Sequence, residues 1–98
     1  MTRRLIVRPA AQLDIEEAAS RYESRRTGLG EEFTAQLDQL FQRIVAGPFQ
    51  FPVVDQDVRR GLLHRFPYAV YFATGEATIA VIAVLHQHRH PDTWRQRN

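Results

Sequence analysis

Three histidines near the C-terminal end are the side chains best suited to chemistry. His86, His88 and His90 recur at i, i+2 and i+4, so on a continuing strand all three rings would point to one side. Three imidazoles on one side could hold a zinc ion. Pro91 follows at once and is expected to end the strand, and no carboxylate is evident to orient the rings. We therefore expect a polar strand end with partly exposed rings and no metal site.

The same histidines, taken with nearby arginines, suggest RNA cleavage as an alternative. That reaction needs a base for the 2′-hydroxyl, an acid for the leaving 5′-oxygen and cations for the phosphorane. His86 or His88 could act as acid or base near neutral pH. The phosphate would then be held by guanidinium groups, for which the candidates are Arg60, Arg65 and Arg89.

Composition indicates one folded domain over residues 1–98. The chain is 44% hydrophobic and 24% charged, which is typical of a globular protein. It has no cysteine, so disulfides and thiolate zinc sites are excluded, and a reducing cytoplasm fits. Its apolar runs are too short for a signal peptide or a membrane span. We expect a cytoplasmic protein that does not enter a membrane.

The charge pattern favours an anionic partner. Net charge is only +2, yet all thirteen basic residues are arginine. A GC-rich genome would produce this bias, but arginine also binds carboxylates and phosphates bidentately. From residue 50 onward the chain has six arginines, four acids and all four histidines. The positive surface should therefore belong to the second half, and it suits an acidic peptide or a nucleic acid.

Three consecutive strands are predicted between residues 58 and 90. Residues 58–66 alternate with period two, which places one set of side chains (Arg60, Leu62, His64) opposite another (Arg59, Leu63, Arg65). Pro67 leads into a second strand over residues 68–73, and the Gly-containing residues 74–77 form an antiparallel hairpin with a third.

The third strand, residues 78–85, is apolar on both faces. Strict alternation places Ile79, Val81 and Leu85 on one face, and Ile82 and Val84 on the other. Such a strand needs a cover on both sides. The chain must supply one cover, and the other could come from a partner.

The first half of the chain supplies that internal cover. A short strand over residues 4–8 ends at Pro9, and helices are predicted from residue 10 to about 26 and from 31 to 46. Acidic residues of the first helix are expected on its solvated face: Asp14, Glu16, Glu17 and Glu23. Residues 49–57 read as an extended connector. The fold class is α+β, in the order β-α-α-β-β-β, with an antiparallel helical hairpin packed on a small, mainly antiparallel sheet.

Several short motifs, in this order and spacing, resemble the RelE/ParE superfamily of bacterial type II toxins over nearly the whole chain. They are Gly28-Leu29-Gly30-Glu31-Glu32-Phe33, Arg59-Arg60, Arg65-Phe66-Pro67-Tyr68, Ile82-Ala83-Val84-Leu85-His86, Arg89 and Trp94-Arg95. The Phe-Pro-Tyr segment and the His-x-x-Arg-x-Pro-x-x-Trp ending look more like the ParE branch than the RelE branch.

This resemblance implies a cognate antitoxin that wraps the toxin with an extended or helical segment. For the ParE branch it also implies inhibition of DNA gyrase with a trapped cleaved-DNA complex, and neither hydrolytic chemistry nor a cofactor. For the RelE branch it implies ribosome-dependent mRNA cleavage. RelE-type nucleases typically carry lysine, or a tyrosine or histidine near the C-terminus paired with a glutamate. This chain has no lysine, and Trp94 cannot move a proton. An inactive member that only binds its partner is a third possibility.

Contact with the antitoxin or the target is predicted on the sheet face away from the helices and on the tail. The sheet face offers apolar contacts flanked by arginine, namely Arg60, Leu62 and His64, with Arg65 and Arg89 close by in the sequence. Tyr68 and Phe72 are expected in the core. Trp94 and Arg95, with Arg97, form a target-contact patch or else fold back over the sheet edge.

Overall fold

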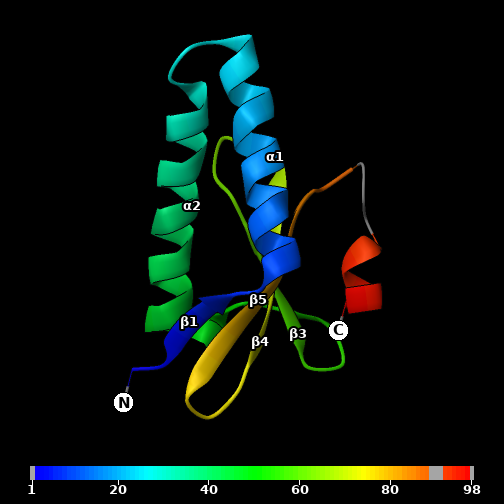
Figure 1. Ribbon diagram of the computed structural model, residues 1–98. Helices are drawn as coiled ribbons and strands as arrows, with labels where there is room; N and C mark the ends of the chain where they lie inside the picture. The colour runs from blue at the N-terminus through cyan, green and yellow to red at the C-terminus, as the bar shows by residue number, and fades with distance from the viewer. Residues whose placement is uncertain (1, 89–91, 98) are drawn as a thin grey trace.

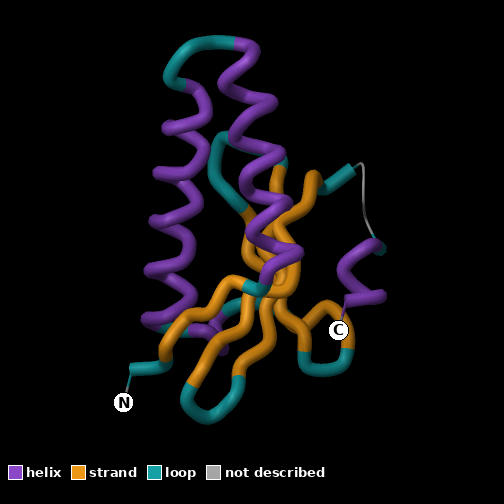
Figure 2. The backbone as a smooth tube through the Cα atoms, viewed as in Figure 1, coloured by secondary structure: helices purple, strands orange, loops and turns teal. Residues whose placement is uncertain are grey.

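The computed structural model describes residues 2–88 and 92–97 (Figure 1). An antiparallel helical hairpin forms one layer, made of α1 (Pro9–Arg25) and α2 (Leu29–Ala46). The second layer is a five-stranded sheet into which both ends of the hairpin lead (Figure 2). The predicted α+β fold class and both helices are thus confirmed.

Local sequence explains where the helices begin and end. Pro9 occupies the first turn of α1, where its missing N–H is not needed. Gly28, with φ of 91°, makes the left-handed turn between the helices. Glu23 fixes this turn, because its carboxylate accepts hydrogen bonds from the N–H groups of Gly28 at 3.0 Å and Gly30 at 3.1 Å. The acidic side chain of Glu23, expected only to face solvent, therefore holds the loop.

The sheet has the strand order β1-β5-β4-β3-β2. Its strands are β1 (Arg4–Val7), β2 (Val53–Asp55), β3 (Val58–Leu62), β4 (Tyr68–Thr74) and β5 (Thr78–His86). Only β1 and β5 pair in parallel, so the sheet is mainly antiparallel, as predicted. The connector over residues 49–57 was not predicted to pair, yet it contributes β2, after the short 3-10 helix η1 (Pro48–Gln50). The strand that was predicted to reach Phe66 ends at Leu62. The chain turns after this residue, and Arg65 has a φ of 74°, which is not an extended conformation.

A β-bulge in β5 overturns the face assignment of that strand. Tyr71 pairs with Ala83 and Phe72 with Val81, so Ile82 is the extra residue. Alternation shifts after this point. Val84 joins Val81 in the core beneath the helices, and Leu85 joins Ile82 on the outer face. The prediction for Val84 and Leu85 was therefore wrong, because strict alternation does not survive an inserted residue.

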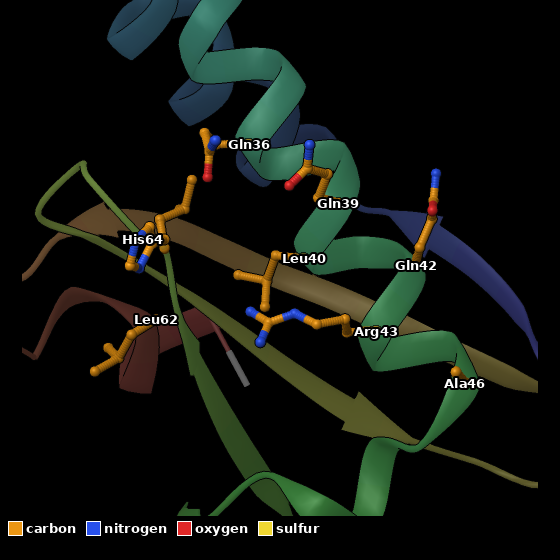
Figure 3. A pocket seen from close by; sticks show the side chains of 9 residues that line it. Gln36, Gln39, Leu40, Gln42, Arg43, Ala46, Leu62 and His64 are labelled. Atoms are coloured by element: carbon orange, nitrogen blue, oxygen red, sulfur yellow. The ribbon is translucent and has the colours of Figure 1, made fainter.

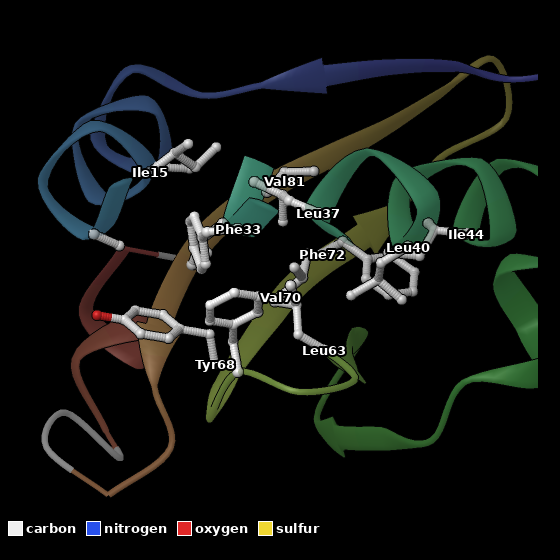
Figure 4. Packing of buried hydrophobic residues seen from close by; sticks show 14 of the residues in the cluster. Ile15, Phe33, Leu37, Leu40, Ile44, Leu63, Tyr68, Val70, Phe72 and Val81 are labelled. Atoms are coloured by element: carbon white, nitrogen blue, oxygen red, sulfur yellow. The ribbon is translucent and has the colours of Figure 1, made fainter. Parts of the chain in front are cut away.

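The main core lies between the helices and the sheet. Phe33, Leu37 and Leu40 of α2 point toward Val70 and Phe72 of β4 (Figure 4). Edge-to-face contacts between Phe33 and its aromatic neighbours close one end of this core, with ring centroids 5.4 Å from Phe66 and 5.2 Å from Tyr68. Tyr68 and Phe72 are buried, as expected.

A second, smaller core covers the opposite face of the sheet. Trp94, from the 3-10 helix η2 (Thr93–Arg97), stacks on Tyr71 of β4 with ring centroids 4.8 Å apart and planes 14° apart. The cluster also contains Val58, Ala69, Ile82, Ala83 and Leu85. The second cover that β5 requires thus comes, at least in part, from the tail of the same chain. Among the described residues, no helix is both long and apolar enough to cross a membrane.

Candidate functional site

The tail is fixed by a carboxylate of α1. Asp14 accepts a hydrogen bond from the backbone N–H of Val84 at 3.0 Å, and bonds from two nitrogens of the Arg97 guanidinium at 2.6 and 3.1 Å. Val84 lies beyond Val81, the last β5 residue that β1 pairs with, so its N–H needs another acceptor. The Asp14 side chain is only 11% exposed. The expectation that Asp14 belongs to a solvated face was therefore wrong.

Arg97 completes this attachment from the other side. Its guanidinium also donates to the Ile82 carbonyl at 3.3 Å, at the position of the bulge. Hydrogen bonding to Asp14 raises the pKa of Arg97 above its ordinary value, against the opposing effect of burial. The ion pair thus joins the tail, α1 and β5 at one point.

The structure divides the predicted tail patch. Trp94 is 3% exposed. Of the two alternatives for this residue, the structure therefore supports the one in which it folds back over the sheet. The prediction that Trp94 is an exposed contact residue is therefore corrected, because the indole ring lies inside the second core. Arg95 does reach solvent, with a side chain that is 53% exposed, beside Asp55 at 3.8 Å and Asp92 at 3.3 Å.

A groove runs between α2 and the end of β3 (Figure 3). Its volume is about 900 Å³, and it brings together Leu62 and His64 with polar residues of α2, namely Gln36, Gln39, Gln42 and Arg43. The Leu62 side chain is 46% exposed. β2 pairs with β3 at Val58 and Arg59, and the Arg60 N–H donates to the Pro52 carbonyl at 3.1 Å, so among the described strands this edge is open only at the end of β3, around Leu62.

Arg60 and Arg59 lie on opposite faces of β3, as predicted. Arg59 faces the helix side and donates to the Phe51 carbonyl at 2.7 Å. Arg60 pairs with Tyr71 on the outer face, and its Nε is buried without a hydrogen-bond partner among the described residues. The outer face therefore presents Arg60 and Leu62 together at the edge of the second core.

Arg65 and His86 meet at a different place, a cleft on the helix side of the sheet. They share it with Arg21 and Arg25 of α1 and with aromatic side chains, and its volume is about 270 Å³. The residues considered for RNA cleavage are thus only partly brought together. Arg60 lies on the other face. His88 is next to His86: its N–H donates to Nδ1 of His86 at 3.2 Å, and the two ring centroids are 5.9 Å apart. Arg89 and His90 lie outside the described residues.

Sequence inspection missed Arg21 and Arg25. Their spacing of i, i+4, which places both on one helix face, was the signal that the sequence offered. Among residues 2–88 and 92–97, no group of three histidine, cysteine or acidic side chains could hold a metal ion.

Comparison with known proteins agrees with this fold. The family model described as "ParE toxin of type II toxin-antitoxin system, parDE" matches residues 5–91. A solved structure described as "Chromosomal ParDE TA system from P. aeruginosa" superposes with a TM-score of 0.77 at 15% sequence identity. The match covers 87% of this chain and 96% of that one. No curated protein matches. Since the family model spans most of the sequence, the chain belongs to the ParE toxin family of type II toxin–antitoxin systems.

Proposed function

We propose that this protein is a cytoplasmic toxin that inhibits DNA gyrase by binding it and that a cognate antitoxin neutralises it. The family match over residues 5–91 is the observation on which this rests. Gyrase is the target that the resemblance to the ParE branch implies. The proposed action is binding rather than hydrolysis, and it requires no cofactor.

The groove between α2 and β3 is the proposed antitoxin site. The end of the β3 edge, around Leu62, offers backbone groups to an extended segment, and the Leu62 side chain offers an exposed apolar anchor. His64 and Arg43 line the same groove, and Arg60 lies beside Leu62 on the outer face. An antitoxin with an extended, partly acidic segment would match these features.

Pulse induction in a bacterial host tests the target. We expect DNA synthesis to fall first, with induction of the DNA-damage response, while protein synthesis continues. An early arrest of protein synthesis would contradict the proposal. If neither process changes, the chain is an inactive, partner-binding member of the family.

A matched pair of variants tests the groove. The product of the neighbouring gene should co-elute with the wild-type toxin at nanomolar affinity. Leu62→Asp places a charge in the groove and should weaken this complex at least tenfold, whereas Leu13→Asp alters an α1 leucine that is 59% exposed and should not. Equal losses for the two variants, or none for either, would place the antitoxin elsewhere.

One observation favours a second candidate, the ribosome-dependent mRNA endonuclease. Arg65 and His86 share a cleft, as that chemistry requires of a phosphate holder and a proton donor or acceptor. Cleavage of ribosome-bound mRNA in a purified translation system tests this candidate. Ribosome-bound mRNA left intact by the wild-type protein removes this candidate, and cleavage lost in His86→Ala would establish it.

A further inference from the structure

The cleft that contains Arg65 and His86 is lined by positive charge from two separate parts of the chain. Arg21 and Arg25 lie one helical turn apart on α1, about 6 Å along the helix axis. Arg65 belongs to the turn between β3 and β4, and His86 is the last residue of β5. Three guanidinium groups and an imidazole therefore surround one concavity.

Arg65 is held in place by unusual local structure. Its backbone φ of 74° is a conformation that non-glycine residues rarely adopt. Glu32 accepts a hydrogen bond from the Arg65 guanidinium at 2.9 Å, and the same guanidinium lies 5.3 Å from the centre of the Phe66 ring. The Arg65 side chain remains 49% exposed. Its charge is thus positioned at the cleft and still accessible.

Arg21 and Arg25 add charge that the described chain does not neutralise. Among residues 2–88 and 92–97, neither guanidinium forms an ion pair, and that of Arg25 lies over the Tyr22 ring, 5.4 Å from its centre. Glu32 is shared between Arg65 and Arg26, and Glu17 lies beside Arg21 in the adjoining depression. Three arginines and no carboxylate line the cleft itself, so its lining carries an excess of positive charge.

Aromatic side chains pack together along one wall of the cleft. Tyr22 packs on Phe66 at 4.9 Å and on Tyr68 at 6.0 Å, and Tyr68 packs edge-on against His86 at 5.4 Å. An apolar wall on one side strengthens the field of the arginines on the other. Of the donors, Arg65 is already held by Glu32, whereas the exposed Arg21 and Arg25 would become ordered when an anion binds.

From these features we propose that the cleft formed by Arg21, Arg25, Arg65 and His86 binds a phosphate group. A phosphate carries up to two negative charges and offers three oxygens to separate guanidinium groups, which matches the surplus charge and the number of donors. A carboxylate carries one charge and is satisfied by a single arginine fork. The ligand is the terminal phosphate of a nucleotide or two successive diesters of a nucleic-acid strand, which together carry the same two charges.

Titration monitored by NMR of arginine Nε–H and histidine resonances tests this proposal on the intact toxin. The probes are inorganic pyrophosphate, a single-stranded octanucleotide without terminal phosphates, and an acidic peptide of the same length. Saturable shifts at Arg21, Arg25, Arg65 and His86 with pyrophosphate alone identify a terminal phosphate as the ligand. Equal or tighter binding of the octanucleotide identifies the diester. Binding of the peptide alone, or of no probe, overturns the proposal.

Paired variants separate this site from general electrostatic attraction. Arg21→Gln/Arg25→Gln should weaken binding of the phosphate probe at least tenfold, because two direct charged hydrogen bonds are removed. Arg4→Gln/Arg8→Gln removes the same charge from exposed positions elsewhere and should leave affinity within about twofold. Since the first pair makes no ion pair in the described chain, both variants should fold, which a thermal melt verifies. Equal weakening in the two variants would show that no specific site exists. This test reads binding by the isolated protein, so it does not depend on gyrase inhibition.

Discussion

Replacing Trp94 by alanine distinguishes a structural tail from a target-contact patch. The indole is 3% exposed and stacks on Tyr71, so its removal empties the middle of the second core. A contact residue would behave in the opposite way, because its loss would leave folding unchanged and remove only binding.

The size of the effect follows from the buried area. A buried tryptophan removes about 150–250 Å² from water, and at about 25 cal/mol per Å² this gives an upper bound of about 4–6 kcal/mol. Measured Trp→Ala costs in cores are about 3–5 kcal/mol. Since η2 is a short 3-10 helix that can shift to relax the cavity, we expect a loss near the lower end, about 3 kcal/mol.

Urea unfolding followed by far-UV circular dichroism measures this loss. Trp94 is the only tryptophan, so its fluorescence in the wild type reports whether the tail detaches before the rest unfolds. Gln96→Ala, at an exposed position of the same 3-10 helix, is the control and should change the unfolding free energy by less than about 0.5 kcal/mol. A Trp94→Ala variant that keeps its stability within about 1 kcal/mol and loses toxicity would refute the structural role.

Three further predictions concern the parts that hold the fold together. Asp14→Ala leaves the N–H of Val84 without its acceptor and should cost about 1–3 kcal/mol in urea unfolding; a loss below about 0.5 kcal/mol would contradict the tail attachment. Gly30→Ala would bring its Cβ to 2.7 Å from a carbonyl oxygen of α1 and should lower the thermal midpoint through overpacking, whereas alanine at Gly28 meets no atom within 4 Å and suffers only from its positive φ. Equal shifts at the two glycines would argue against close helix contact. The pKa of Glu32 is lowered, chiefly by a hydrogen bond from an arginine, so the stability that it adds is present above its unfolded pKa of about 4.3 and is lost as pH falls through the lower folded pKa. The stability difference between wild type and Glu32→Gln should therefore vanish in acid, and a difference that persists there would contradict the ion pair.

Much of the fold could be predicted because its signals are local. Apolar periodicity defined both helices, and Pro9, Gly28 and Gly47 marked their ends. The β4–β5 hairpin followed from two strand-like runs and a short Gly-containing turn. Each of these signals needs only neighbouring residues.

The errors arose where distant residues act together. The bulge at Ile82 leaves no mark in the composition, and it alone reversed the faces of Val84 and Leu85. Asp14 looked like any acidic helix residue, because its partners lie 70 and 83 positions away along the chain.

In the candidate site, too, the errors concern residues that lie far apart in the sequence. Arg65 and His86 were chosen for their chemistry and do share a cleft, but Arg60 belongs to the other face of the sheet. Arg21 and Arg25 were missed, since only the packing of α1 beside the β3–β4 turn brings them to that cleft.

The most direct test of the proposed function uses purified DNA gyrase, supercoiled plasmid and this toxin. We predict that the toxin causes cleaved plasmid to accumulate in proportion to its concentration, and that adding the product of the neighbouring gene prevents this. Gyrase that cleaves and supercoils DNA normally in the presence of folded toxin would contradict the proposal.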